Sequence, residues 1–344
     1  MSAIIQAERL TLDAYEADLS AAGWPLRQLA ACLPDVLDTV DELAPGRRLV
    51  WLAGLRQAWQ RHAWVMSPAT RRELLQLAQA WCDWPLAGAV GETLLETGTL
   101  DAEAALWLME AWAMHGEFEA ACDLAVHWQL AVPADARFSG AHRQLSVWQD
   151  WCAEWSELAD DMLLLTPLVH QHVHGFAWAY HDPAIAKLCC LPAFQDAGEW
   201  HAWLNGRYDD GDEWPLAIIH RGWGFVGCVH LILADDLGFL FYWLSPDFRG
   251  LGIASHACAL LLENLPDLRA CYAKVYADNA PSRRLLERLG FIDLGIHATP
   301  PDQDELFYRR GEPAPRETVV AELHELMRQM GSQTQVAAVM GAVR

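Results

Sequence analysis

Two glycines separated by one residue stand between an aromatic run and a helical pattern, in the segment SPDFRGLGIASHA at 245–257. Glycine allows a sharp turn and lets another molecule approach the backbone closely. The amides of such a turn, with the dipole of a helix that begins near Ile253, favour an anion such as a pyrophosphate. The segment fits neither GxxxxGK[ST] nor GxGxxG, which weakens nucleoside-triphosphate and dinucleotide readings.

A second segment with a recognisable pattern follows at 279–291, NAPSRRLLERLGF. Asn279 suits a helix N-cap, because its side chain can accept a hydrogen bond from an amide of the first turn. The leucines recur at helical spacing, and Gly290 suits the end of the helix. The pattern therefore predicts a short helix after a strand at 270–277.

The two segments together resemble the signatures of the GNAT superfamily of N-acetyltransferases. Residues 249–254 fit its acetyl-coenzyme A loop, [QR]-x-x-G-x-[GA], and residues 279–291 fit its second motif. The resemblance covers about 160–311 and is nearest to the branch with the ribosomal-protein N-terminal acetyltransferases. It implies an α/β acyl-CoA N-acyltransferase fold whose mixed sheet splays between two central strands, here 239–244 and 270–277.

The resemblance also implies acetyl-CoA as the co-substrate. The family's pyrophosphate contacts fall on the glycine loop, chiefly on backbone amides, and its pantetheine contacts fall beside the splay. The cofactor-binding residues expected on this basis are Leu244, Arg249, Gly250, Leu251, Gly252, Ile253, Ala254, Asn279 and Ser282.

The implied chemistry is direct attack of a primary amine on the thioester, which needs a neutral amine and a proton for the departing thiolate. Many superfamily members place a tyrosine where this chain has Leu286. In the resembled branch a serine near the thioester sulfur matches Ser282, which is expected to be the proton donor or a hydrogen-bond partner of the sulfur. That branch often carries a glutamate early in the fourth strand, where this chain has Phe239. Tyr242, and His230 in the preceding strand, are the substitutes by proximity.

A run of histidines, His170, His172 and His174 with His181 nearby, resembles a metal cluster at first sight. No HExxH accompanies it, and no third ligand stands at a clear spacing. We therefore expect a solvated helix face and no metal site.

The composition narrows the choice of partners. The chain has 344 residues and a formal net charge of −22, which argues against a nucleic-acid binder and suits a cationic acceptor. Its nine cysteines form no CxxC, and no stretch reads as a signal peptide or membrane span. A cytoplasmic protein with free thiols fits these features best.

The first half is predicted to be helical throughout. Residues 104–135 read as two helices with a break at His115-Gly116 and a stop at Pro133, and residues 71–100 repeat the pattern more weakly. This texture resembles helical hairpins of tetratricopeptide type. Two interpretations remain open, a concave peptide-binding surface and a plain helical bundle with tryptophan as core filler.

The second half is predicted to alternate strands and helices. Strands are expected at 162–168, 214–220, 224–234, 239–244, 270–277 and 304–310, and helices at 170–180, 197–208, 253–265 and 279–291. An amphipathic helix is expected at 316–330. The predicted domains are a helical domain at 1–155, an acetyltransferase domain at 160–311 and a helix with a tail at 312–344.

The sequence thus predicts an acetyl-CoA-dependent N-acetyltransferase. The expected acceptor is a protein N-terminus or lysine, with a possible protein partner on the helical domain. The alternatives are a small amine acceptor, such as a polyamine, an aminoglycoside or an amino acid, and a non-catalytic acyl-CoA sensor.

Overall fold

The computed structural model describes residues 47–153, 158–180, 185, 194–208, 212–265, 268–298, 305–330 and 336–337. The chain divides into two compact units. The first contains Met1–Ser156 and Ile219–Phe225, and the second contains Glu157–Ile218 and Val226–Arg344. His181 and the Cys189-Cys190 pair lie outside the described residues.

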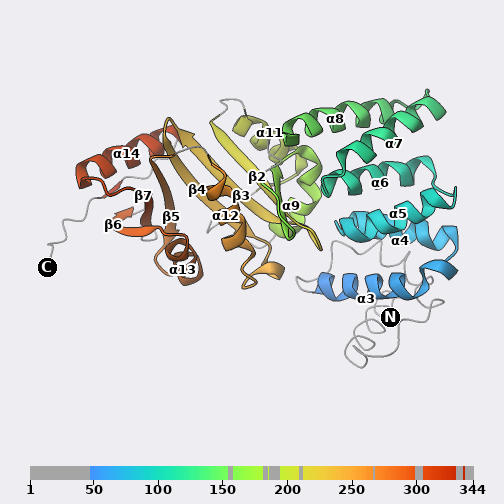
Figure 1. Ribbon diagram of the computed structural model, residues 1–344, viewed down its shortest axis with the longest axis horizontal. Helices are drawn as coiled ribbons and strands as arrows, with labels where there is room; N and C mark the ends of the chain where they lie inside the picture. The colour runs from blue at the N-terminus through green and yellow to red at the C-terminus, as the bar shows by residue number, and fades with distance from the viewer. Residues whose placement is uncertain are drawn as a thin grey trace. The chain divides into compact units, whose positions relative to one another are not determined.

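The first unit is an array of helical hairpins. Its described helices are α3 (Arg47–His62), the short η2 (Ala63–Val65), α4 (Pro68–Ala80), α5 (Trp84–Glu96), α6 (Ala102–Met114), α7 (Phe118–Ala131) and α8 (Ala136–Ala153). From α4 to α8 each helix packs on the next, and α4 also contacts α6, as α6 contacts α8. Figure 1 shows α4 to α8 lying in a row. This arrangement fits the predicted tetratricopeptide-like texture.

Local signals place the helices of this array. Ser67, Asp83 and Asp101 precede α4, α5 and α6, and each side chain accepts a hydrogen bond from an amide of the first turn. Trp81 and Trp84 are fully buried between the helices, as expected for tryptophan used as core filler. The array is therefore built from short-range caps and repeated packing between neighbours.

The second unit contains a mixed sheet of eight described strands. They are β1 (Leu163–Pro167), β2 (Glu213–His220), β3 (Gly224–Ala234), β4 (Leu237–Leu244), β5 (Ala270–Tyr276), β6 (Ile292–Ala298), β7 (Glu305–Gly311) and β8 (Val336–Ala337). Their order is β1-β2-β3-β4-β5-β7-β6-β8. β4 and β5 run parallel, whereas β3 with β4 and β5 with β7 run antiparallel.

The six predicted strands are confirmed, but the sequence reading missed β6 and β8. The pairing of β6 with β7 shifts register between Asp293 and His297, and Gly295 between them has a φ of +58°. A bulge of this kind breaks the alternation of apolar and polar residues by which a strand is recognised. The strand that follows the second motif therefore left no clear pattern.

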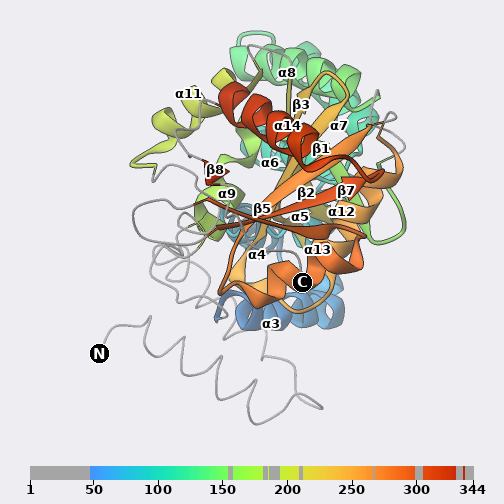
Figure 2. The same ribbon diagram turned by 90° about the vertical axis from the view of Figure 1, so that its left-hand side faces the viewer.

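Helices cover both faces of the sheet. They are η3 (His170–His172), α9 (Val173–Tyr180), α11 (Ala197–Tyr208), η4 (Pro246–Phe248), α12 (Ile253–Glu263), α13 (Ala280–Arg288) and α14 (Arg316–Gln329). Phe176 of α9 packs on Trp243, and Leu323 of α14 shares a cluster with Phe239, so these helices lie on the face of the odd-numbered β4 residues. Figure 2 shows α14 on one side of β5 and β7, with α12 and α13 on the other.

The amphipathic C-terminal helix is fixed to the sheet by a buried carboxylate. Glu322 of α14 contacts the hydroxyl of Tyr272 and the guanidinium of Arg269. Arg309, which is 3 % exposed, donates from Nε to the same hydroxyl at 3.0 Å. Because α14 covers β4, β5 and β7 in this way, it forms part of the core of the second unit.

Candidate active site

The two central strands, β4 and β5, separate halfway along their length. β4 pairs with β5 from Leu237–Leu240 opposite Ala270–Ala273, yet β4 continues to Leu244 and β5 to Tyr276. Beyond Leu240 the two strands keep only their outer partners, β3 and β7. The predicted splay between 239–244 and 270–277 is therefore present, and it opens toward the loop that follows β4.

The backbone of β4 offers hydrogen-bonding groups to this splay. Ser245 donates from its amide to the carbonyl of Val226 at 2.9 Å, continuing the β3–β4 ladder. Hydrogen-bonded and non-hydrogen-bonded pairs alternate in an antiparallel ladder, so the main-chain groups of Tyr242 and Leu244 face away from β3. They face the gap, where β5 no longer provides partners. Leu244 was predicted to line the cofactor site, and its backbone has the orientation that such a role requires.

The glycine loop has the backbone that its sequence suggested. After η4, whose Phe248 is buried as an anchor, Gly250 and Gly252 adopt φ angles of +79° and +82°. Gly252 is the N-cap of α12, and a Cβ added at either glycine would meet no atom within 4 Å. The loop therefore leaves open space in front of the helix N-terminus.

The remaining loop residues divide into anchors and exposed positions. Ile253 is buried, so its side chain fixes the start of α12 while its amide, like that of Ala254, lies in the first helical turn without an acceptor inside the helix. Arg249 and Leu251 are exposed, and Leu251 is 68 % accessible. Amides and one arginine thus gather at the open end of the splay, which is the arrangement expected of an anion site.

The structure brings the two candidate catalytic residues together. The hydroxyls of Tyr242 on β4 and Ser282 on α13 lie 2.6 Å apart. Asn279 helps to position Ser282, because its Oδ1 accepts a hydrogen bond from the Ser282 amide at 3.2 Å. The predicted N-cap at Asn279 is confirmed. Residues from the second signature segment and from β4 therefore meet beside the splay.

A contact that the sequence reading missed lies behind the glycine loop. His256, in the first turn of α12, approaches Asp160 with 2.5 Å between Nε2 and Oδ2. Asp160 also accepts hydrogen bonds from the amides of Met162 and Leu163. The contact joins the start of α12 to the start of β1, which are far apart in sequence, so no local pattern could have revealed it.

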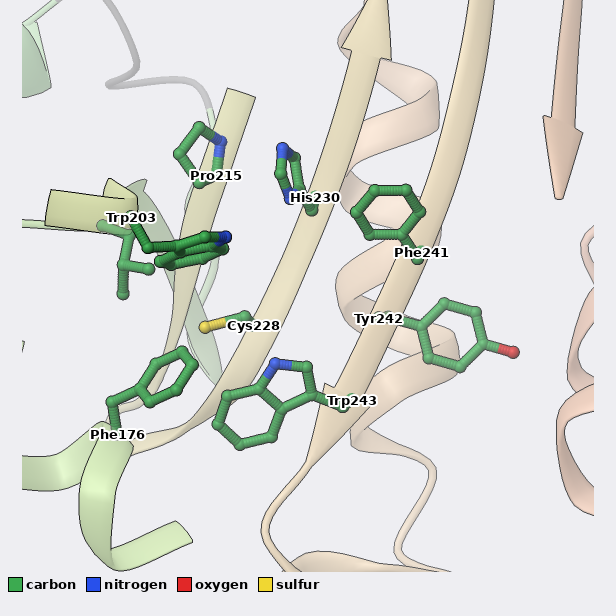
Figure 3. A pocket seen from close by; sticks show the side chains of 9 residues that line it. Phe176, Trp203, Pro215, Cys228, His230, Phe241, Tyr242 and Trp243 are labelled. Carbon is green, nitrogen blue, oxygen red and sulfur yellow. The ribbon is translucent and has the colours of Figure 1, made fainter. Parts of the chain in front are cut away.

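An aromatic pocket opens on the other face of β4 (Figure 3). Its lining residues are Leu168, Phe176, Trp203, Pro215, Cys228, His230, Phe241, Tyr242 and Trp243. Leu168 follows β1, and the others come from β2, β3 and β4 and from the helices α9 and α11 that cover this face. From the sequence, only the β4 residues, whose alternation places Phe241 and Trp243 on one side, and His230 of the preceding strand could be expected here.

His230, a substitute considered for the base, lies in the wall of this pocket. Burial lowers the pKa of its imidazole, although the nearby Glu213 acts in the opposite direction. Its Nε2 lies 3.0 Å from Glu213 Oε2, and Glu213 Oε1 pairs with Arg207 Nη1 at 3.0 Å. His230 is therefore a neutral side chain near pH 7.

The histidine run does not form a metal site among the described residues. His172 is buried rather than solvated, its Nδ1 accepts from the Val169 amide at 2.9 Å, and burial lowers its pKa to about 3. His170 instead stacks on His201 and contacts Asn205. The expectation of a solvated helix face is wrong for His172, because the 3-10 turn before α9 points this ring inward. Within the described part of the chain, no helix has the length and hydropathy needed to cross a membrane.

Comparison with known proteins identifies the class of this unit. Residues 162–292 match the model of the acetyltransferase (GNAT) domain. The second unit therefore contains a GNAT acetyltransferase domain, and the predicted fold and enzyme class, an acetyl-CoA-dependent N-acetyltransferase, are confirmed. A comparison with curated proteins gave no match.

Solved structures similar to the chain include three acetyltransferases. The microcin C7 self-immunity acetyltransferase MccE, in complex with acetyl-CoA and AMP, is 18 % identical over 46 % of this chain and 99 % of its own, with a TM-score of 0.42. Spermidine N-acetyltransferase from Vibrio cholerae, in complex with CoA and spermine, is 17 % identical over 44 % and 96 %, with a TM-score of 0.40. An acetyltransferase from Salmonella typhimurium that modifies the N-terminal serine of ribosomal protein L7/L12 is 18 % identical over 45 % and 97 %, with a TM-score of 0.40.

Proposed function

We propose that this protein transfers the acetyl group of acetyl-CoA to the N-terminal α-amine of a peptide or protein. The observation that supports the proposal is the junction of two features, the splay beyond Leu240 and the glycine loop at its open end. A donor with a diphosphate at one end and an extended arm at the other fits this junction. The diphosphate meets the helix N-terminus, and the arm pairs with the free edge of β4.

The donor-binding residues are assigned on this basis. The amides of Gly250, Gly252, Ile253 and Ala254 receive the diphosphate, and the exposed Arg249 adds a positive charge. The main-chain groups of Leu244 and Tyr242 pair with the pantetheine amides, replacing the partners that β5 no longer supplies. Leu251 covers the loop from outside, and Asn279 approaches the pantetheine from the other wall.

Tyr242 and Ser282 act as a proton-donor pair in the reaction. The amine nitrogen attacks the thioester carbonyl carbon, the carbon–sulfur bond then breaks, and the departing sulfur takes a proton from the Ser282 hydroxyl. The 2.6 Å contact lets Tyr242 return a proton to Ser282. The excess proton of the attacking amine leaves to solvent. A proton from solvent then restores the Tyr242 hydroxyl and replaces the one that the amine released, so atoms and charge balance without any further reactant.

Among the described residues beside the splay no side-chain base is assigned, which favours an α-amine over lysine as the acceptor. An α-amino group has a pKa near 7.8, so roughly one in seven is neutral at pH 7, whereas lysine with a pKa near 10.4 is neutral in only about 0.04 % of molecules. An acceptor that loses its proton to solvent before attack is therefore far more abundant as an N-terminus. Polyamines share the disadvantage of lysine.

Binding and turnover test the proposal separately. CoA should raise the melting temperature of the full-length protein, and acetyl-CoA with a peptide acceptor should release free thiol. Ser282→Ala should lower kcat by about 100-fold or more with little change in CoA affinity. Ser282→Thr, which keeps the hydroxyl, should recover much of the rate, and Tyr242→Phe should cost less than Ser282→Ala.

Two results would contradict this proposal. Tight CoA binding with no thiol release for any amine would leave a sensor in place of an enzyme. An unchanged kcat in Ser282→Ala would remove this hydroxyl from the proton transfer and return the role to solvent.

A further inference from the structure

The aromatic pocket and the splay share one strand. Phe241 is the first residue of β4 beyond the pairing with β5, and the side chains of Phe241 and Trp243 point into the pocket while the hydroxyl of Tyr242 points away from it (Figure 3). If the glycine loop holds the diphosphate at the open end, the other end of the donor points toward Leu240. The thioester then lies beside this pocket.

The lining of the pocket is apolar and uncharged. Phe176, Trp203, Phe241 and Trp243 supply most of the wall, and none of the described lining residues is a carboxylate, a lysine or an arginine. The polar members are accounted for, since burial keeps His230 neutral and the Tyr242 hydroxyl contacts Ser282. A charged group entering this pocket would lose water without meeting an opposite charge.

The carboxylate of Glu213 does not change this conclusion. Glu213 stands behind His230, 3.0 Å from its Nε2, and its other oxygen is paired with Arg207. Its charge is therefore already balanced. A second cationic centre, as in a polyamine, would find no counter-ion at the wall.

The rings also leave no open cage for an ammonium group. Phe176 meets Trp243 nearly perpendicularly, at 84° and 5.0 Å between centroids, and His230 meets Phe241 at 75° and 4.6 Å. In each pair the edge of one ring therefore covers a face of the other. A cation–π site needs such faces exposed to the charge.

We propose that this pocket receives the side chain of the acceptor's first residue and selects an uncharged, apolar one. The inference rests on the proposed function, because the pocket can select only what the thioester can acetylate. The acceptor class is thereby narrowed to peptides and proteins whose N-terminal residue is apolar, with the α-amine turned toward the splay and the side chain turned toward Phe176 and Trp203.

A peptide series in the full-length protein tests the selection. The peptides differ only in their first residue, Ala, Val, Met, Asp or Lys, and spermidine serves as the polyamine probe. We expect kcat/KM to be at least about tenfold higher for the best apolar peptide than for the Asp and Lys peptides or spermidine. Equal values, or a preference for Asp, Lys or spermidine, would overturn the pocket assignment while leaving the acetyltransferase proposal intact. Absence of thiol release with every amine would instead refute the proposed function.

Two variants show whether the pocket causes the preference. Trp203 is only half-buried, so Trp203→Ala widens the pocket with little risk to folding and should raise the Met-to-Ala ratio of kcat/KM at least about fivefold. Cys228→Leu fills the pocket and should reverse that ratio. Neither change should alter the KM for acetyl-CoA. Trp64→Ala, a change at an exposed tryptophan of the helical unit, is the matched control. An unchanged ratio in Trp203→Ala would overturn the proposal.

Discussion

The two halves of the β4–β5 pair differ in where their strands find hydrogen-bond partners. In the half that we call closed, Leu237–Leu240 and Ala270–Ala273 pair with each other as parallel strands. In the open half, the same strands run on without each other, and β4 keeps only β3 as its partner. Both halves are rich in β-forming aliphatic and aromatic residues, so propensity alone does not explain the separation.

The closed half is stabilised by side chains of α14 and β7. The carboxylate of Glu322 on α14 contacts Tyr272, which stands opposite Phe239 across the parallel pair, and Arg309 joins the same cluster. The open half has no such reinforcement on the splay side. Its polar groups include the main chain of β4, the glycine loop, the Tyr242–Ser282 pair and, on β5, Lys274, which pairs with the buried Glu305 of β7 at 2.8 Å.

This difference shows which part of a buried sheet is available to bind a ligand. A backbone group that has lost its neighbour must find another partner, because an unpaired buried N–H or C=O is costly. The open half therefore favours a bound donor, whereas the closed half holds the sheet together. Changes in the closed half should act on stability, and changes in the open half should act on binding and rate.

The largest effect is expected from Glu322→Ala in the closed half. The change leaves the buried Arg309 without its carboxylate, and loss of one partner of a buried ion pair costs about 3 to 5 kcal/mol. Urea unfolding, followed by hydrogen exchange at β5 and β7 amides, measures the loss. Glu325→Gln on the exposed side of the same helix is the control and should leave these amides unchanged. If both variants behaved alike, the buried cluster would not reinforce the closed half.

A slightly smaller effect is expected from Gly252→Val in the open half. A branched residue resists the +82° φ, and its side chain would occupy the space in front of α12. CoA affinity, measured by calorimetry, should fall at least about 100-fold, as a helix N-terminus loses its anion.

Gly290 provides a control with the same backbone angle. Its φ is also +82°, and a Cβ there would likewise meet no atom within 4 Å. Gly290→Val should therefore cost similar stability through backbone strain but leave CoA affinity within about twofold. Equal loss of affinity in both variants would mean that strain, and not the loop, controls donor binding.

The smallest effect concerns the helix that covers the open half. Burial lowers the pKa of His172 to about 3, so below pH 6.5 the unfolded chain takes up a proton that the folded chain refuses. Stability from this group is complete above pH 6.5 and falls as the pH decreases toward 3. Between pH 7 and pH 5 the loss is about 2 kcal/mol, at about 1.4 kcal/mol per pKa unit.

His172→Asn isolates this contribution. The asparagine Oδ1 can accept the Val169 amide in place of Nδ1, but it takes up no proton. Urea unfolding at pH 7 and pH 5, with hydrogen exchange read at α9, should show a smaller pH dependence in the variant. An identical pH dependence would place the acid sensitivity of the second unit in other groups.

Much of the fold and of the donor site could be predicted from local patterns. The loop at 249–254, the N-cap Asn279 and six of the strands follow from residue types and spacings, because turns, caps and alternation are short-range properties. The bulged strand β6 was missed because Gly295 interrupts its alternation. The inward turn of His172 was missed because a single histidine carries no signal of its burial.

The sequence alone determined that a glycine loop precedes α12, that Asn279 begins α13 and that the first unit repeats helical hairpins, since each of these depends on neighbours along the chain. Only the tertiary structure decided that Tyr242 meets Ser282, that Glu322 closes one half of the strand pair and that rings from α9, α11 and β4 enclose a pocket. These contacts join residues far apart in sequence, and their geometry depends on how the sheet twists and where its central strands separate.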